Sequence, residues 1–206
     1  ELGFDSFTIK INNRKILNGF FKHLNIDDSA EVLRAIDKID KIGLKGVLKE
    51  LSEIGLDDRN INEIIEFMQI QGTNTEILHT LKEMNIDNEI FLLGLEELNS
   101  VIDNVGYFGV PEENLKIDLT IARGLDYYTG TVYETFLDEY PSIGSICSGG
   151  RYDNLAEYYT KQKLPGVGIS IGLTRLFYQF KEANIIKNNK NNLTDVLIIP
   201  MEGCVK

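Results

Sequence analysis

ARGLDYYTGTVYE, residues 122–134, joins the end of one β-branched stretch, LKIDLTIAR, to the start of the next, TVYETFL. Within thirteen positions it places an arginine, an aspartate, a glutamate, three tyrosines and two glycines. A half-buried strand would alternate apolar and polar side chains along its whole length, and this stretch does not. It therefore predicts a glycine-containing turn between two strands that also carries chemically active side chains.

Short apolar stretches on both sides of this turn predict a sheet. FDSFTIKIN, near the start of the chain, alternates Phe7, Ile9 and Ile11 with polar residues, as a half-buried strand does. LKIDLTIAR, TVYETFL, SIGSICSGG and PGVGISIG follow one another later, with no helix-length insert before Arg151. This close succession favours an antiparallel meander over parallel β-α-β units. RYDNLAEYY and GLTRLFYQFKEANII predict helices that flank the sheet.

The segment between the first strand and the later ones predicts only helices. Asn13 begins one, NRKILNGFFKHL, and SAEVLRAIDKIDKIG predicts another from Ser29 to Gly43, with apolar residues at three- and four-residue steps. GVLKELSEIGL and RNINEIIEFMQIQG repeat the pattern, Thr75 caps a further helix, and a long one runs from Asn88 to Val105. Short amphipathic helices with tight loops predict a small bundle.

Charge divides the chain at the same place. Residues 24–104 contain 18 Asp and Glu against 7 Lys and Arg, so they account for the whole net charge of −11. Such a step in composition indicates a domain boundary. The fold class we predict is α+β: an antiparallel sheet with flanking helices, interrupted by an all-helical insertion.

Composition limits the remaining possibilities. No run approaches the roughly 18 apolar residues that a membrane span needs, so we expect no membrane contact. Cys147 and Cys204 lie far apart without a CxxC motif, which favours a reducing, cytoplasmic location over a disulfide framework or a zinc site. The chain begins at Glu1 rather than Met and ends in TDVLIIP, a strand-like stretch after the polar KNNKNN. We expect it to be a piece of a longer protein.

Three clusters carry the chemistry. Arg123 offers the paired donors that a carboxylate or phosphate oxygen accepts, and Tyr127 and Tyr128, adjacent on extended backbone, should point to opposite faces. The alternative is a structural ion pair of Arg123 with Asp126 or Glu134.

In CSGGRYD, Gly149 and Gly150 allow a bulky group, a ligand or another strand, to approach the backbone. GVGISIGLTRL places Arg175 one turn into a helix that begins after Gly172, where it can stack on a base, although an exposed surface arginine is the simpler interpretation.

In this order, ARGLDYYTGTVYE, SGGRYD and GVGISIGLTRL resemble the histidine-specific motifs and the third class-defining motif of histidyl-tRNA synthetases, a family of class II aminoacyl-tRNA synthetases. INNRKIL resembles the segment before that family's helical insertion domain, and TDVLIIP the start of its anticodon-binding domain. The resemblance implies catalytic core in 1–23 and 106–187, a helical insertion in 24–105, and a linker with the start of the anticodon-binding domain in 188–206.

The resemblance also implies roles for the site residues. Arg123 would be catalytic and contact both the ATP α-phosphate and the histidine carboxylate. Tyr127 and Tyr128 would belong to the histidine pocket, with Gly149 and Gly150 in its wall. The resemblance further implies that Arg175 and Gly172 bind ATP, that Mg²⁺ accompanies ATP, and that no residue here is a metal ligand.

The implied partners are ATP, histidine and tRNA(His), in a homodimer. The family's first and second motifs are absent from this chain, so we expect the isolated chain to be inactive. Two alternatives are non-catalytic: a regulatory subunit of ATP phosphoribosyltransferase, and a tRNA-sensing synthetase-like module. The intact RGLDYYTG motif speaks against both.

Overall fold

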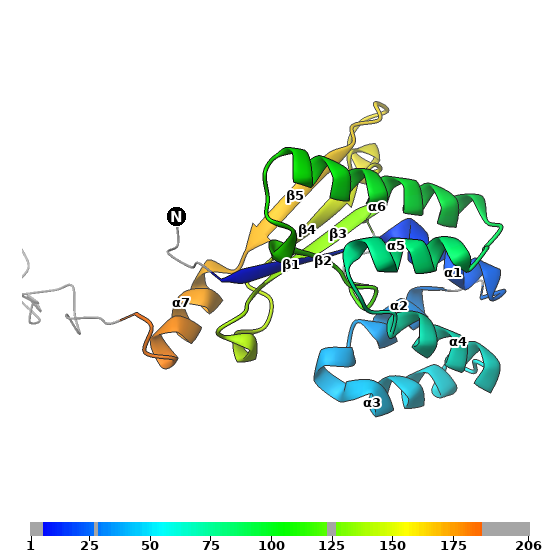
Figure 1. Ribbon diagram of the computed structural model, residues 1–206, viewed down its shortest axis with the longest axis horizontal. Helices are drawn as coiled ribbons and strands as arrows, with labels where there is room; N and C mark the ends of the chain where they lie inside the picture. The colour runs from blue at the N-terminus through cyan, green and yellow to red at the C-terminus, as the bar shows by residue number, and fades with distance from the viewer. Residues whose placement is uncertain (1–5, 27–28, 123–126, 187–206) are drawn as a thin grey trace, which may run out of the picture. The chain divides into compact units, whose positions relative to one another are not determined.

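The computed structural model describes residues 6–26, 29–122 and 127–186 of the chain. Arg123, and with it the remainder of the RGLD stretch, lies outside these ranges. The chain divides into two compact units, Glu1–Ile171 and Gly172–Lys206, and each is described by itself. Figure 1 labels the elements of both units along the chain.

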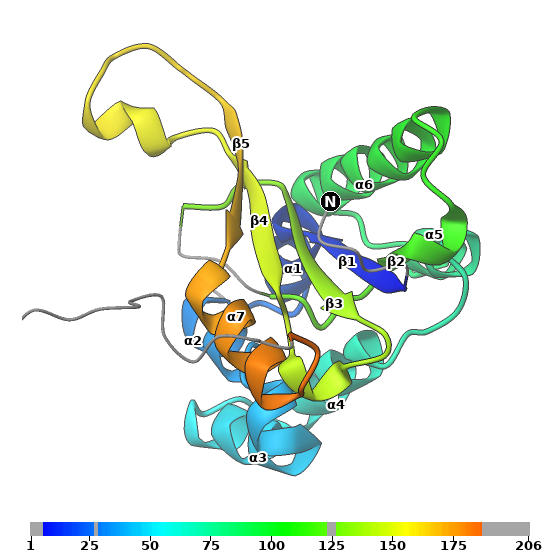
Figure 2. The ribbon, with the colours of Figure 1, turned by 90° about the vertical axis from the view of Figure 1, so that its left-hand side faces the viewer.

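A five-stranded sheet forms the centre of the first unit among the described residues, with the strand order β2-β1-β3-β4-β5. The strands are β1 (Phe7–Asn13), β2 (Leu115–Ile117), β3 (Thr131–Leu137), β4 (Cys147–Tyr152) and β5 (Gly166–Ile171). As predicted, β3, β4 and β5 form an antiparallel meander, and β3 also pairs antiparallel with β1. Figure 2 shows β3, β4 and β5 side by side.

The sheet is mixed rather than purely antiparallel, which corrects one part of the prediction. β2 runs parallel to β1, with Ile9 opposite Leu115 and Ile11 opposite Ile117. A parallel pair needs a long crossover between its strands. Here the helices between β1 and β2 supply that crossover, so the helical segment is what allows β2 to return in the same direction. The α+β class itself is confirmed.

Helices fill the chain between β1 and β2, and one follows β5 in the second unit. The α-helices are α1 (Arg14–His23), α2 (Ser29–Ile36), α3 (Ile39–Glu53), α4 (Asp58–Met68), α5 (Asn74–Glu83), α6 (Glu89–Tyr107) and α7 (Leu173–Glu182). Short 3-10 helices are η1 (Glu112–Asn114), η2 (Pro141–Ile143) and η3 (Leu155–Tyr158). None of the helices in the described ranges is long and apolar enough to cross a membrane.

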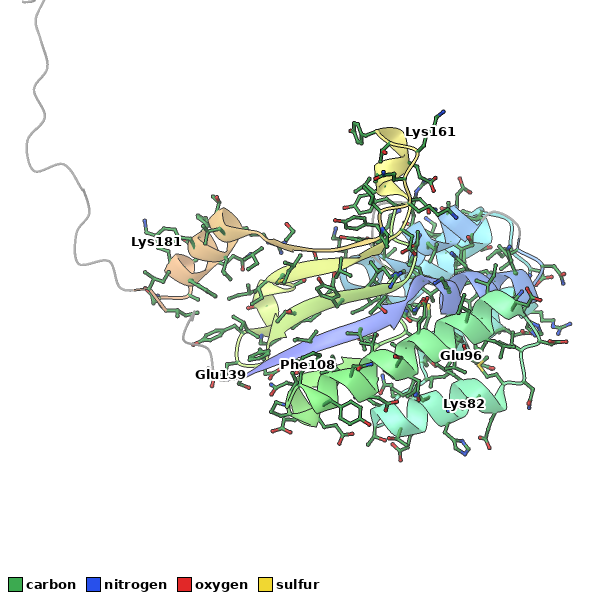
Figure 3. All side chains as sticks on the ribbon, turned by 90° about the horizontal axis from the view of Figure 1, so that it is seen from above. Lys82, Glu96, Phe108, Glu139, Lys161 and Lys181 are labelled. Atoms are coloured by element: carbon green, nitrogen blue, oxygen red, sulfur yellow. The ribbon has the colours of Figure 1, made fainter. Side chains whose placement is uncertain are left out.

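Several predicted helix boundaries were wrong. The helix expected from Ser29 to Gly43 is two: α2 ends at Ile36, and α3 begins at Ile39 and is interrupted at Gly43, whose φ is 66°. Thr73 rather than Thr75 caps α5, because Thr73 and Glu76 form a reciprocal capping box. RYDNLAEYY is not a helix: its first two residues end β4, and only η3 is helical. η3 and Lys161 lie on the connection from β4 to β5 (Figure 3).

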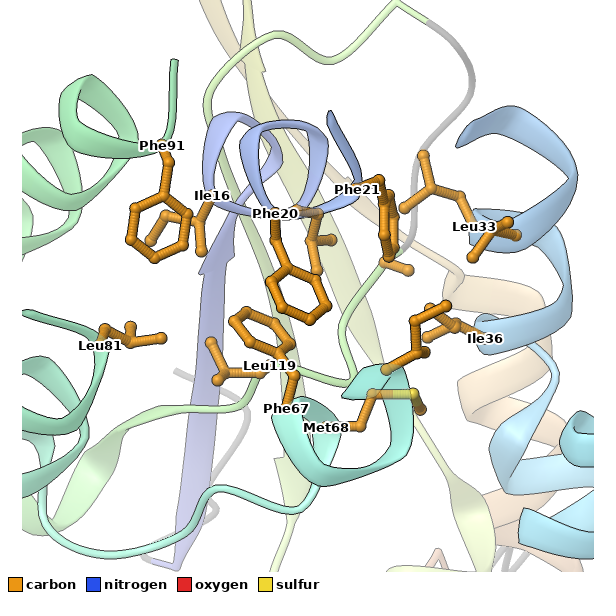
Figure 4. Close-up of a cluster of buried hydrophobic side chains, with 14 of the residues drawn as sticks. Ile16, Phe20, Phe21, Leu33, Ile36, Phe67, Met68, Leu81, Phe91 and Leu119 are labelled. Atoms are coloured by element: carbon orange, nitrogen blue, oxygen red, sulfur yellow. The ribbon is translucent and has the colours of Figure 1, made fainter. Parts of the chain in front are cut away.

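One hydrophobic core connects the helices to the sheet. Phe20 on α1 and Phe67 on α4 stack with ring centroids 4.1 Å apart and an interplanar angle of 16°. Figure 4 shows this pair between α5 and α6 on one side and α2 on the other. The same buried cluster includes Ile11 of β1, Leu115 of β2 and Leu119. The division into core and insertion at residues 23 and 105 stays a prediction.

α6 packs directly against α1 through two glycines. A Cβ added at Gly19 would lie 2.4 Å from the backbone nitrogen of Phe91, and one added at Gly94 would lie 2.6 Å from that of Ile16. Both distances are far shorter than any real Cβ contact, so the two helices approach closely because both positions are glycine. α1 begins one residue after β1 ends, and this contact therefore fixes α6 beside the end of β1.

Candidate functional site

Three tyrosines from two of the sequence motifs meet at one end of the sheet. The rings of Tyr127 and Tyr128 lie with centroids 4.6 Å apart, and Tyr127 lies 6.1 Å from Tyr152 in an edge-to-face arrangement of 89°. All three side chains are half-buried. Tyr127 and Tyr128 were predicted to point to opposite faces, and this was wrong. Tyr127 lies in a turn that precedes β3, so the alternation of an extended strand does not apply to the pair.

The tyrosine rings lie on strand positions occupied by glycine. A Cβ at Gly150 would be 2.9 Å from Cδ1 of Tyr128, and one at Gly166 would be 2.5 Å from Cε2 of Tyr152. Gly150 pairs with Gly168, and Tyr152 with Gly166, so these alternate positions of β4 and β5 share one face. The glycines thus form a flat backbone surface on which Tyr128 and Tyr152 rest. We call the three tyrosines, Tyr127, Tyr128 and Tyr152, the tyrosine cluster.

A side chain at Gly149 would point to the opposite face of the sheet. A Cβ there would lie 2.1 Å from the carbonyl oxygen of Gly168 and 2.6 Å from the Tyr133 hydroxyl. That hydroxyl donates a hydrogen bond of 2.7 Å to the Gly168 carbonyl oxygen, so the Tyr133 side chain crosses β4 above Gly149. Burial raises the pKa of Tyr133, and the nearby Cys147 adds to this. The space left by Gly149 is therefore filled by a tyrosine of the chain itself.

Asp153 connects the turn of the tyrosine cluster to the end of β4. Its carboxylate accepts a hydrogen bond of 2.7 Å from the Thr129 hydroxyl and one of 2.9 Å from Nε of Arg151. The Thr129 amide in turn donates to the Arg151 carbonyl oxygen at 2.9 Å. The Thr129 hydrogen bond lowers the pKa of Asp153; burial opposes this, and Arg151 adds to the lowering. The two motifs ARGLDYYTGTVYE and SGGRYD are thus held together by an ionised carboxylate.

The electrostatics keep the Tyr128 phenol protonated. Burial, together with a hydrogen bond and charge interaction with Tyr127, raises the pKa of Tyr128 to about 12. At neutral pH Tyr128 is therefore a neutral phenol that can donate to one ring nitrogen of an imidazole or accept from the other. A neutral phenol beside two further aromatic rings and bare strand backbone suits a flat polar ring better than it suits an anion.

Three of the predicted site residues are not among the described residues of the first unit. Arg123 falls outside the described ranges. Gly172 and Arg175 belong to the second unit, where Gly172 occupies the N-cap position of α7 and Arg175 is an exposed residue of its first turn. The structure thus brings together Tyr127, Tyr128 and Gly150 in the first unit. Within the described residues, no group of three or more His, Cys, Asp or Glu could hold a metal ion.

Tyr152 and Asp153 belong to the candidate site but were missed by sequence reasoning, although both stand in SGGRYD. A signal was available for Tyr152. In a strand, residues two apart lie on the same face, so Tyr152 had to share a face with Gly150. Asp153 carried no comparable signal, because its partner Thr129 approaches only once β3 and β4 have paired.

The fold is that of the synthetase class. The crystal structure of histidyl-tRNA synthetase from a Nostoc species matches it with a TM-score of 0.85 and 46% identity, over 88% of this chain and 43% of that one. A Bacillus halodurans protein described as an ATP phosphoribosyltransferase regulatory subunit/histidyl-tRNA synthetase matches with a TM-score of 0.66 at 21% identity. That second likeness shows the fold alone.

Sequence comparison identifies the family within that class. The family model described as histidyl-tRNA synthetase matches residues 1–176. A histidine–tRNA ligase of Clostridium tetani is 62% identical over 98% of this chain, which corresponds to 46% of the relative's own length. The chain belongs to the histidyl-tRNA synthetase family, and it spans about half the length of the curated relatives it matches.

Proposed function

We propose that the protein containing this chain is a histidine–tRNA ligase. In this reaction the histidine carboxylate attacks the α-phosphorus of ATP, and pyrophosphate leaves with the electrons of the broken P–O bond. A hydroxyl at the 3′ end of tRNA(His) then attacks the histidyl carbonyl, and AMP leaves. The observation that carries the proposal is the tyrosine cluster. In a chain of this family, it brings together residues of two motifs that resemble histidine-specific motifs, ARGLDYYTGTVYE and SGGRYD.

The cluster supports recognition of the amino acid. The Tyr128 phenol, neutral at physiological pH, hydrogen-bonds a ring nitrogen of the substrate imidazole, and Tyr127 and Tyr152 form the aromatic wall around it. Gly150 contributes by allowing Tyr128 to lie against the strand, and Gly149 does the same for Tyr133 on the other face. In this proposal Gly150 shapes the pocket through Tyr128, and Gly149 acts only through Tyr133 on the opposite face.

The other roles are proposed from the family resemblance. Arg123 would neutralise charge on the α-phosphate and hold the histidine carboxylate, and Arg175, after Gly172, would stack on adenine. A cytoplasmic location, a homodimer and Mg²⁺ bound with ATP belong to the same proposal. The described residues contain no carboxylate cluster that fits Mg²⁺, and no step above depends on the ion.

Histidine-dependent ATP–pyrophosphate exchange by the full-length protein tests the proposal. For Tyr128→Phe we expect the KM for histidine to rise about 10-fold, because one hydrogen bond to the substrate is lost. Tyr159→Phe is the matched control, since Tyr159 is 91% exposed and its hydroxyl lies at the surface. A full-length protein that exchanges pyrophosphate with no amino acid, or equally with all of them, would refute the proposed function.

A further inference from the structure

Arg14 contacts both ends of the segment that carries the tyrosine pair. Its backbone amide donates a hydrogen bond of 2.9 Å to the carbonyl oxygen of Gly130. Nη1 of its guanidinium donates one of 2.7 Å to the carbonyl oxygen of Ala122. The residue is only 7% exposed, although it is an arginine. Tyr127 and Tyr128 lie in the sequence between these two acceptors.

The residue before α1's cap strengthens this anchoring. Nδ2 of Asn12, a fully buried side chain, donates to the carbonyl oxygens of Leu119 at 3.2 Å and Ile121 at 3.0 Å. Asn12 and Arg14 therefore hold three carbonyls of the backbone that leads into the tyrosine segment. Burying the charged side chain of an arginine costs free energy unless its N–H groups donate hydrogen bonds. A buried arginine is therefore normally found where it holds specific acceptors in place.

The backbone of Arg14 is itself fixed from α6. Asn13 caps α1 by accepting from the amide of Lys15 at 2.9 Å, and its Nδ2 donates to Glu97 at 2.9 Å. The Lys15 ammonium pairs with the same carboxylate of Glu97. This brings the helix that ends the predicted insertion into contact with the residues on either side of Arg14. Arg14 thus projects from a rigid support.

We infer that Arg14 is a positioning residue for histidine binding: its amide and its guanidinium fix the two ends of the segment that presents Tyr127 and Tyr128. The inference rests on the proposed function and extends it to a residue that contacts no reacting atom. Fixing both ends of a loop removes conformations that would have to be lost on substrate binding. The tyrosines are therefore held in place before histidine arrives. Loss of the guanidinium should weaken histidine binding.

The experiment compares Arg14→Gln and Arg14→Lys with the unsubstituted full-length protein in pyrophosphate exchange. Either variant keeps the backbone bond to Gly130 and removes the guanidinium bond to Ala122. For Arg14→Gln we expect the histidine KM to rise about 10-fold, as for a charge-assisted hydrogen bond. Arg14→Lys, which keeps the charge without the planar fork, should lie between. A histidine KM within about 2-fold of the parent's in both variants would overturn the inference.

Leu81→Ala is the control for general destabilisation, since Leu81 is fully buried on α5, away from the tyrosine cluster. It should lower the melting temperature and leave the histidine KM unchanged. A rise in histidine KM in Leu81→Ala equal to that in Arg14→Gln would also overturn the inference.

Amide exchange provides a readout that needs no activity. The Thr129 amide, bonded to the Arg151 carbonyl, should exchange faster in both Arg14 variants, whereas the Val132 amide within β3 should not. An inactive parent protein would therefore refute the proposed function and still leave the anchoring by Arg14 to be decided. Equal Thr129 exchange in parent and variants would count against the anchoring alone.

Discussion

Gly149 and Gly106 differ in how much space surrounds a methyl group added by substitution with alanine. At Gly149 the new Cβ would lie 2.1 Å from the backbone oxygen of Gly168, whereas at Gly106 in α6 nothing lies within 4 Å. We expect Gly149→Ala to lower the free energy of unfolding by about 3 kcal/mol or more, because a backbone atom of a paired strand cannot move aside. Gly106→Ala should raise it by about 0.5–1 kcal/mol through helix propensity.

Urea denaturation of both glycine variants checks this pair. The contrast matters more than either value, since the same substitution is made in both cases. If Gly149→Ala were as stable as the parent protein, β4 and β5 could not be paired as closely as the structure has them.

Asp118 gives the stability a dependence on pH. Burial raises the pKa of its carboxyl, but hydrogen bonds from Lys10 at 2.7 Å and from the Thr120 hydroxyl at 2.5 Å outweigh this, so the pKa is lowered overall. A lowered folded-state pKa contributes stability above the unfolded value, and this is lost as pH falls through the folded value. Acidification below about pH 4 should therefore destabilise the protein partly through Asp118.

Thermal melting from pH 7 to pH 2 tests the role of Asp118. Asp118→Asn should lose about 2 kcal/mol at pH 7, the value of hydrogen bonds to a charged group, and show a shallower decline in acid. Glu113→Gln, at an exposed carboxylate in η1, is the control and should follow the parent curve. An unchanged acid decline in Asp118→Asn would show that other carboxylates cause it.

At the residue scale, the sequence predicted which residue types form the site better than how they are arranged. The tyrosine pair and Gly150 were named from two motifs through the family resemblance, and the structure places them together, whereas their roles stay a prediction. Their relative orientation was not predictable, since it depends on a turn at Tyr127 whose conformation is set by partners distant in sequence, such as Asp153.

At the scale of an element, Asn74 protects the edge of the sheet. Its side chain acts like a peptide group of a further strand: Nδ2 donates to the Leu115 carbonyl at 2.9 Å, and Oδ1 accepts from the Ile117 amide at 2.8 Å. Asn74→Ala would leave a donor and an acceptor of β2 without this partner. We expect a loss of about 2–4 kcal/mol in the free energy of unfolding.

Asn104→Ala is the matched control for Asn74, because the Asn104 amide bonds only Ser100 on the exposed side of α6. It should change the stability by less than about 0.5 kcal/mol in the same denaturation experiment. Equal effects of the two substitutions would mean that the pairing of Asn74 with β2 is not stabilising.

Helix existence was predictable except at RYDNLAEYY, which forms only the 3-10 helix η3, and helix boundaries were less so. Asn13 and Asn88 were read correctly as starting points because an Asn before an apolar periodic stretch is a strong cap. The break between α2 and α3 was missed, since the apolar period continues through Ile36 and Ile39 while the backbone does not. The parallel pairing of β2 was missed because a three-residue strand carries no signal of direction.

At the scale of the whole first unit, the shared core predicts a single unfolding transition. The chain contains no tryptophan, and none of its nine tyrosines lies between residues 24 and 105, so tyrosine fluorescence reports only on the later part of the chain. Phe67 lies in α4 and is 2% exposed. We expect Phe67→Ala to lower the stability by about 3–5 kcal/mol and to shift the tyrosine transition as far as the transition seen by circular dichroism.

Phe108→Ala is the control, because Phe108 is 86% exposed at the end of α6 (Figure 3) and should shift neither transition. This measurement also decides the predicted boundaries at residues 23 and 105. A helical insertion that folds separately would lose its own transition in Phe67→Ala and leave the tyrosine transition of the sheet in place. The step in charge cannot decide this, since surface carboxylates do not report on what lies beneath them.

The anchoring by Arg14 has a consequence for the order of events during protein synthesis. The arginine and the Ala122 carbonyl that it holds are 108 residues apart in the sequence. While the ribosome is still making the helices, Arg14 has no acceptor and the nascent β1 has no neighbouring strand. The helices can collapse early through local contacts, whereas the sheet must wait for distant ones. The tyrosine cluster is therefore one of the last parts of this unit to mature, and a nascent chain stalled before β2 would expose an unpaired β1 to chaperones.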